Sequence, residues 1–297
     1  MALSDKYINP LTDFGFKKLF GVEPNKALLI DFLNQLLPPV HQIKELTYTK
    51  NEHLGSSQYE RKAIFDLYCE SLSGEKFIVE VQKAKQNFFK DRSVYYSTFP
   101  IQEQAKKGNW DFKLAAVYTI GILDFVFDEH KDQEQLLHTV KLKDQNGDIF
   151  YQKLTYIYIE LPKFKKVDAE LSNRFDKWLY VFRHLANLQN RPAALQERIF
   201  EQLFEAAEIA KFSPSEKEKY EESLKYYRDL KNVVDSSKEE GIIIGIEQGI
   251  EQGLEQGIEQ GKMQEKINIA KNLKQQGLTS EMIVKVTGLS IEVIQKL

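Results

Sequence analysis

Two short segments constrain the fold of this 297-residue chain more than any other feature. The runs Phe65–Leu67 and Phe77–Gln82 alternate apolar and polar residues, as β-strands do when their two faces meet different surroundings. The intervening Ser73-Gly74 is typical of a tight turn. Pairing about this turn sets position 70 against 76, 68 against 78 and 66 against 80. We therefore predict an antiparallel hairpin in this register.

The predicted register brings two acidic residues together. Asp66 and Glu80 become cross-strand neighbours on one face, with Gln82 two residues further along it. Like charges directly opposite each other destabilise a sheet, and the surrounding apolar residues make buried carboxylates costly. A divalent cation would offset that cost, and two carboxylates completed by water and substrate phosphate suit Mg²⁺. A solvated strand face is the alternative interpretation.

Composition restricts the class of protein. Apolar residues make up 42% of the chain and aromatic residues 12%, which is enough for a substantial core. The net charge of −3 excludes a global basic signature of nucleic-acid binding, so such binding needs a local patch. The single cysteine, Cys69, excludes a disulfide framework and fits a reducing compartment. Without a signal-like leader or a membrane-length apolar run, we expect a soluble cytoplasmic protein.

The order of elements indicates an α/β (α+β) fold with a mixed sheet flanked by helices. Before position 165 we predict a helix at 24–38, a strand at 42–50, the hairpin, a helix at 87–107, a strand at 112–123 and a second hairpin at 125–162. Helices follow at 175–189 and 193–211, and the charge-rich stretch 215–231 indicates a solvated helix. We divide the chain into a mixed αβ domain at 1–165, a helical region at 166–237, a glycine-repeat helix at 238–265 and a small helical hairpin at 266–297.

Six glycines recur at every fourth position near the C-terminus, at Gly241, Gly245, Gly249, Gly253, Gly257 and Gly261. On a helix such a row drifts by about 40° per repeat. Each glycine costs up to about 1 kcal/mol in a lone helix, so this helix needs a packing partner. Glycine rows allow helices to approach closely, and we predict homo-oligomerisation here, with a flexible linker as the alternative.

The segment 270–297 is similar to a helix-turn-helix, with turn residues at Gly277 and Gly288. Its last helix offers only Lys296 to contact bases or phosphates, whereas sequence readout needs several polar side chains. We therefore predict a small helical hairpin that caps the repeat.

Three motifs, taken in order, resemble a known family. They are Thr12–Gly21 (TDFGFKKLFG), Gly74–Gln82 (GEKFIVEVQ) and Arg92–Ser97 (RSVYYS). Together with the Asp … Glu-x-Gln signature, they are similar to the recombination-promoting nuclease (Rpn) family within the PD-(D/E)XK nuclease superfamily. The resemblance is strong over residues 5–125 and looser beyond them.

This resemblance implies a metal-dependent DNA endonuclease that acts in DNA recombination or mobile-element biology. Carried over by position, Asp66, Glu80 and the carbonyl of Val81 would hold Mg²⁺ or another divalent cation. Gln82 stands where the superfamily often has a lysine. A glutamine can orient a water or a phosphate, but it supplies no positive charge.

Six further residues are candidates for the rim of the site or for DNA contact: Asp13, Lys17, Glu60, Lys83, Arg92 and Tyr96. Asp13 and Lys17 lie four apart and share a helix face, and Glu60 shares the strand face of the acidic pair by parity. The same alternation turns Lys83 to the opposite face. Each residue also has a purely structural interpretation, as a surface ion pair, a strand-edge charge or core packing.

Residues 76–113 hold eight Lys/Arg against four Asp/Glu, a surplus that can follow a phosphate backbone. Arg92 and Tyr96 are one helical turn apart, so Arg92 can reach a scissile phosphate. The five histidines are scattered and lack the spacing of a zinc site. Two alternatives stay open: a non-catalytic DNA-binding or protein-interaction module organised by the C-terminal helix, and a nuclease that acts on RNA.

Overall fold

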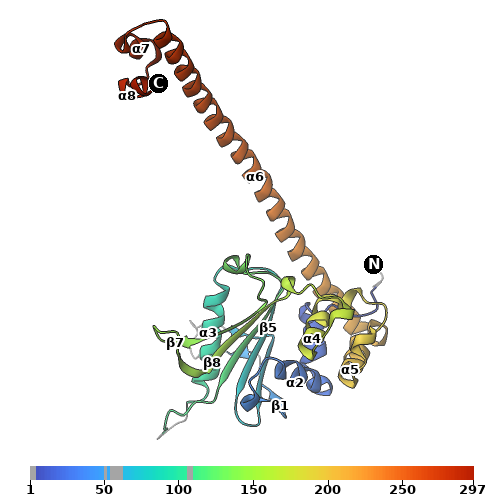
Figure 1. Ribbon diagram of the computed structural model, residues 1–297. Helices are drawn as coiled ribbons and strands as arrows, with labels where there is room; N and C mark the ends of the chain where they lie inside the picture. The colour runs from blue at the N-terminus through green and yellow to red at the C-terminus, as the bar shows by residue number, and fades with distance from the viewer. Residues whose placement is uncertain (1–4, 50–51, 54–62, 106–109) are drawn as a thin grey trace. The chain divides into compact units, whose positions relative to one another are not determined.

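The computed structural model describes residues 5–49, 52–53, 63–105 and 110–297. The chain forms two compact units, Met1–Asn232 and Val233–Leu297 (Figure 1). The first unit holds the strands and every described candidate for the functional site, and the second unit is helical.

A six-stranded mixed sheet organises the first unit, with the strand order β1-β4-β5-β6-β8-β7. Its strands are β1 (Leu46–Tyr48), β4 (Leu67–Ser71), β5 (Lys76–Gln82), β6 (Val117–Leu123), β7 (Leu137–Lys143) and β8 (Ile149–Glu160). A separate two-stranded sheet joins β2 (Glu52–His53) to β3 (Ala63–Ile64). β5, β6 and β8 run parallel, and the other neighbours in the large sheet are antiparallel. The predicted mixed sheet is thereby confirmed.

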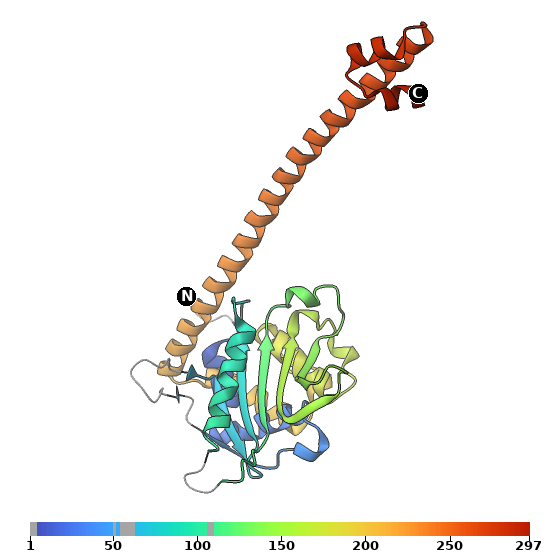
Figure 2. The same ribbon diagram turned by 90° about the vertical axis from the view of Figure 1, so that its left-hand side faces the viewer.

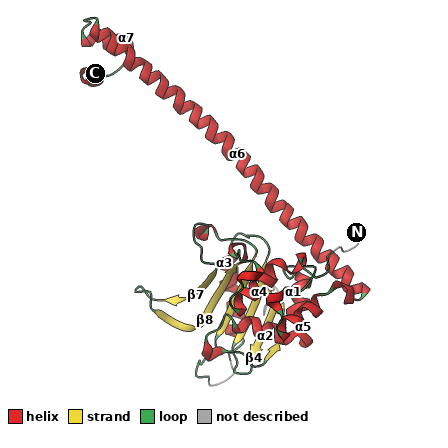
Figure 3. Ribbon diagram, turned by 45° about the vertical axis from the view of Figure 1, so that its right-hand side comes forward, coloured by secondary structure: helices red, strands yellow, loops and turns green. Residues whose placement is uncertain are grey.

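Helices cover both faces of this sheet. They are α1 (Asp13–Phe20), α2 (Lys26–Asn34), α3 (Phe89–Gln102), α4 (Arg174–His184), α5 (Arg198–Ala207) and the start of α6 (Pro214–Gln275). α3 lies on one face, which Figure 2 turns toward the viewer, while α1, α2, α4 and α5 gather on the other (Figure 3). The main core lies between the sheet and that second group, around the buried rings of Phe20, Phe32, Trp178 and Phe182.

The β4–β5 hairpin has the predicted register. Tyr68 pairs with Ile78 and Glu70 with Lys76, and Gly74 takes a φ of +92° in the turn, a conformation that favours glycine. One detail differs from the prediction. β4 begins at Leu67, so Asp66 lies one residue before the strand rather than inside it.

The parallel strands bring their carboxyl ends to one edge of the sheet. Pairing sets Glu80 of β5 beside Gly121 of β6, which in turn lies beside Tyr158 of β8. The same register relates Gln82 to Glu160 two strands away. Because in-register neighbours in a sheet point to the same face, the acidic residues of β5 and β8 share the face that α3 covers.

Gly121 lets the Tyr158 ring lie close to β6. A β-carbon at position 121 would stand 2.9 Å from Tyr158 Cδ1 and 3.3 Å from Leu123 Cδ2. We therefore expect Gly121→Ala to lower the free energy of unfolding by about 1–3 kcal/mol, measured by urea denaturation. The control is Gly249→Ala, where nothing lies within 4 Å of the added carbon. Equal losses in the two variants would contradict the close contact.

The stretch 215–231 is more than the solvated helix that its composition predicted. It forms the start of α6 and packs against the main core of the first unit, to which it belongs, through Tyr220 and Leu224, which are both buried. The Tyr220 hydroxyl also accepts the backbone N–H of Asn9 at 2.8 Å. Two apolar residues four apart make a narrow stripe, which the many surrounding charges conceal in the sequence.

The second unit contains the glycine repeat and the C-terminal helices. All six repeat glycines are helical and belong to α6. α7 (Ser280–Thr287) and α8 (Ile291–Lys296) pack on the end of α6 around Ala270, Ile283 and Ile294. Gly288 closes α7 in the left-handed conformation, at the turn that the sequence predicted. Within the ranges described above, no helix is long and apolar enough to cross a membrane.

Candidate active site

Asp66 and Glu80 lie together where β4 meets β5. Asp66 Oδ2 accepts the backbone N–H of Val81 at 2.7 Å, and Glu80 Oε1 accepts the backbone N–H of Asp66 at 3.3 Å. Here carboxylate oxygens accept hydrogen bonds from backbone N–H groups, whereas backbone carbonyls accept them elsewhere between β4 and β5. This substitution explains why β4 starts later than predicted. The contacts that close the hairpin therefore also fix both carboxylates.

Both carboxyl groups resist ionisation. Burial raises the pKa of Asp66, and the hydrogen bond from Val81 offsets part of that effect. Burial and the nearby Asp66 together raise the pKa of Glu80 to about 8, against the opposing effect of Arg92. Glu80 is only 7% exposed. A positive charge that both carboxylates share would favour their ionised forms.

Gln82 and Arg92 both approach Glu80. Gln82 Nε2 donates to Glu80 Oε2 at 3.3 Å, and Arg92 Nη2, from α3, lies 4.0 Å from the same oxygen. This Nη2 atom is buried and finds no hydrogen-bond acceptor among the described residues. The Arg92 guanidinium also lies 5.8 Å from the centre of the Tyr96 ring. A buried cationic donor without an acceptor suits an anionic ligand such as phosphate.

A pocket of about 310 Å³ opens beside the acidic pair. Asp66, Val81 and Gln82 line it together with Asp13 of α1 and Tyr226 of α6. The fold therefore collects residues from three distant parts of the sequence around one cavity.

Lys83 lines the same pocket, contrary to the alternation argument. β5 ends at Gln82, so the two-residue period of a strand no longer applies to the next position. The Lys83 ammonium group lies 5.1 Å from the centre of the Tyr226 ring. Burial lowers the pKa of Lys83, while Asp13 and Asp66 oppose that shift. Lys83 thus brings to the pocket the positive charge that Gln82 lacks.

The other predicted rim residues have mixed outcomes. Asp13 and Lys17 form an ion pair at 2.8 Å on α1, and they act in opposite directions on the pKa of Asp66. Lys85, from the basic segment, forms a surface ion pair with Asp128. Glu60 lies outside the described residues.

Comparison with protein families identifies the group to which the chain is related. Residues 10–237 match the model of the PD-(D/E)XK nuclease family transposases. The chain belongs to this family. The resemblance inferred from the sequence is thereby confirmed, and membership indicates a nuclease-like role with DNA as the implied substrate. No curated protein and no solved structure matches the chain.

PD-(D/E)XK nucleases use divalent metal ions, and the acidic pair fits such an ion. Its carboxylate oxygens are the ligands that Mg²⁺ prefers. Burial raises the pKa of both groups, and the nearby Asp66 raises that of Glu80 further, so a cation would relieve the cost of ionising them. Asp66 and Glu80 are the residues that would hold it, and a ligand role for the Val81 carbonyl stays a prediction.

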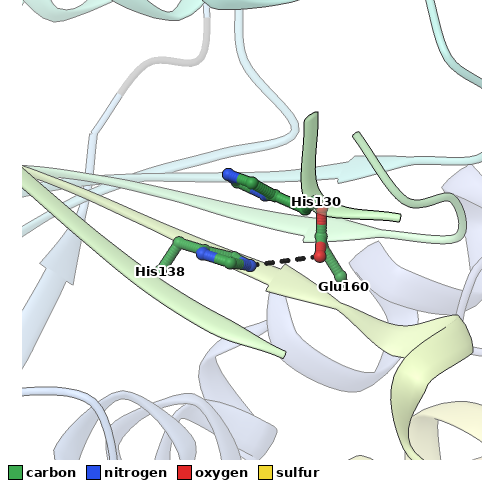
Figure 4. Close-up of side chains that lie close together, drawn as sticks. All are labelled: His130, His138 and Glu160. Atoms are coloured by element: carbon green, nitrogen blue, oxygen red, sulfur yellow. Dashed lines mark hydrogen bonds and ion pairs between the residues drawn. The ribbon is translucent and has the colours of Figure 1, made fainter. Parts of the chain in front are cut away.

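A second group of potential ligands lies at the end of β8 (Figure 4). His130, His138 and Glu160 bring their ligand atoms within 4.8 Å of one another. His130 Nδ1 lies 3.0 Å and His138 Nε2 3.1 Å from the two oxygens of the fully buried Glu160. The interpretation of the histidines as scattered missed this group, because only the β7–β8 register, which pairs His138 with Tyr158, brings it together.

The geometry of this second group favours hydrogen bonding over metal binding. The two imidazole rings stack with centres 3.9 Å apart and planes 16° apart. Rings stacked in this way cannot both direct a lone pair at one ion, and Lys163 already lies 2.7 Å from Glu160 Oε2. A metal ion would require one ring to turn. As arranged, the cluster joins β7 and the segment after β6 to the end of β8.

Proposed function

We propose that this protein is a Mg²⁺-dependent DNA endonuclease that hydrolyses phosphodiester bonds in DNA recombination or mobile-element biology. One observation carries the proposal: the buried Asp66–Glu80 pair lies beside a pocket that also receives Lys83. The family supplies the reaction class, and the donor set favours a hard divalent cation.

The residues divide the work of hydrolysis by their chemistry. A divalent cation held by Asp66 and Glu80 would supply a bound water of lowered pKa and neutralise charge on the phosphate. Gln82 orients the attacking water or a phosphate oxygen through its amide. Arg92, with its unsatisfied Nη2, binds the phosphate, and Lys83 stabilises the negative charge that develops on it.

We also propose that the glycine repeat makes the protein a homo-oligomer. In a Gly-Ile-Glu-Gln unit the glutamate lies about 200° around the helix from the glycine. An interface along the glycines and the exposed Ile246, Ile250 and Leu254 would therefore leave the acidic row in solvent. Two chains would provide two active sites, which suits cutting both strands of a duplex. Two expectations from the sequence remain proposals: the division of the chain into four parts and a cytoplasmic location.

Plasmid cleavage by the purified protein tests the proposed activity. We expect nicking or linearisation with Mg²⁺, none with a chelator, and none with Asp66→Ala in Mg²⁺. A folded wild type that shifts DNA in a gel but leaves the plasmid intact in Mg²⁺ would instead support the non-catalytic DNA-binding module. Cleavage that persists in Asp66→Ala would place the activity elsewhere.

A further inference from the structure

Phe88 combines three features that do not favour stability. Its side chain is 79% exposed, although phenylalanine gains most from burial. Its backbone has a φ of +61°, the left-handed conformation that bulky residues rarely adopt. It also stands at the N-cap of α3, where no side chain caps the helix. Serine, threonine, aspartate and asparagine are the residues that stabilise this position.

A residue that is strained, exposed and uncapped is best explained by what it contacts outside the chain. Backbone strain concentrates at sites where a ligand is held. Glycine would remove the strain at Phe88, and asparagine would reduce it and also offer a cap. Either substitution would relieve the backbone and would remove the aromatic ring. The function of Phe88 must therefore depend on its ring.

The surroundings of Phe88 connect it to the candidate active site. The segment from Lys83 to Phe88 leads directly from β5 into α3, and Gln86 within it lines the pocket of Asp66. The backbone N–H of Arg92 donates to the Phe88 carbonyl at 2.9 Å, so the two residues lie one helical turn apart. Arg92 in turn lies 4.0 Å from Glu80. Phe88 therefore lies one helical turn along the chain from the proposed phosphate-binding residue.

Charge favours a nucleic acid as the partner of this ring. Lys85 and Lys90 flank Phe88 on the surface and pair with Asp128 and Glu129. Such exposed ion pairs are weak, so phosphates can replace the acidic partners. Aromatic side chains stack on bases of any sequence, and apolar side chains enter between base pairs where proteins distort DNA.

We propose that Phe88 stacks on a nucleobase of the DNA substrate beside the phosphate that is cut. This inference rests on the proposed nuclease function and adds a requirement to it: the base next to the scissile phosphate leaves its stack. Phe88 is thus a positioning residue, because it holds the DNA while Arg92 and the acidic pair face the phosphate. DNA whose base stacking is weakened next to the scissile phosphate therefore binds more tightly and is cleaved faster than intact duplex.

Phe112 provides a matched control. It is 76% exposed and has a φ of +57°, so it shares the strain and exposure of Phe88. It precedes β6, at the amino ends of the parallel strands, whereas the acidic pair lies toward their carboxyl ends. Its ring packs against Trp110, with centres 4.7 Å apart.

The experiment compares full-length wild type with Phe88→Gly, Phe88→Trp and Phe112→Gly. A short duplex, intact or carrying one mismatched pair, is the probe, and affinity is measured by fluorescence anisotropy with Ca²⁺ in place of Mg²⁺. We expect Phe88→Gly to melt at or above the wild-type temperature yet to bind about 10-fold more weakly or worse, the loss typical of one stacked base. Phe88→Trp and Phe112→Gly should bind like the wild type.

A 2-aminopurine base in the duplex reports unstacking directly. Its fluorescence should rise when the wild type binds and should not rise with Phe88→Gly. Equal affinity and equal fluorescence in Phe88→Gly and wild type would overturn the stacking role, whether or not the protein cleaves DNA. Wild type that binds and unstacks the probe but never cleaves DNA in Mg²⁺ would contradict the proposed nuclease while supporting the stacking role.

Discussion

Glu80→Gln should lose metal-dependent cleavage by at least about 10³-fold, because it removes a charged ligand from a cation that stabilises the transition state. Glutamine keeps the shape of the side chain and an oxygen that can accept the Asp66 N–H, so the hairpin should persist. Initial rates of plasmid nicking in saturating Mg²⁺ measure the loss. Glu70→Gln is the control, since Glu70 lies on the same hairpin but pairs with Lys76 at its far end.

The same substitution should stabilise the metal-free protein. The folded pKa of Glu80 is about 8, above the ordinary value of 4.5, so the stability that its protonated form contributes is lost as the pH rises through 8. Glutamine cannot ionise and avoids this loss. In chelator at pH 8.5 we expect a melting temperature about 4–8 °C higher than wild type, if about 2 kcal/mol is recovered.

Added Mg²⁺ should raise the melting temperature of wild type but leave Glu80→Gln nearly unchanged, because only an ionised pair binds the cation well. A variant that is inactive and also less stable than wild type in chelator would show that Glu80 serves the fold. Such a result would remove the physical reason for a metal at this pair.

Lys83→Met should reduce the cleavage rate by about 10²-fold, the loss expected for one preorganised charge at the transition state. Methionine retains much of the apolar stem of the lysine and loses only the ammonium group that lies over the Tyr226 ring, so stability should change little. Lys85→Met is the matched control, two residues along the same segment, because Lys85 forms an exposed ion pair with Asp128.

Single-turnover rates at saturating DNA separate the two lysines. Lys83→Met should lower that rate, whereas Lys85→Met should alter only affinity and its dependence on salt. Equal single-turnover rates for Lys83→Met and wild type would show that Lys83 does not stabilise the transition state. The role of the superfamily's lysine would then fall to Gln82 alone.

The sequence predicted the hairpin well because its register depends on local information. A turn at Ser73-Gly74 and two alternating strands determine which residues pair, and the structure pairs Tyr68 with Ile78 as expected. The strand was predicted to begin at Phe65, two residues before β4 starts at Leu67. The side-chain oxygens that accept hydrogen bonds in place of backbone carbonyls leave no trace in a hydrophobic pattern.

Features that depend on tertiary packing could not be predicted from such patterns. The place of Lys83 in the pocket depends on where β5 ends and on Tyr226, which lies far along the chain. The cluster of two histidines on Glu160 depends on the β7–β8 register, which the predicted hairpin at 125–162 did not specify. The packing of Tyr220 into the main core was concealed in the sequence by the neighbouring charges.

In the proposed nuclease, the shared hydrogen bonds of Asp66, Glu80 and Val81 would make the ability to cleave DNA depend on strand register. A slip of one residue between β4 and β5 would turn Glu80 to the opposite face and break both bonds to the acidic pair. A partly folded chain, during synthesis or after transient unfolding, therefore contains Asp66 and Glu80 but does not hold them together as a pair. If the pair is the catalytic centre, as we propose, the chain would become able to cleave DNA only after the hairpin has closed in the correct register.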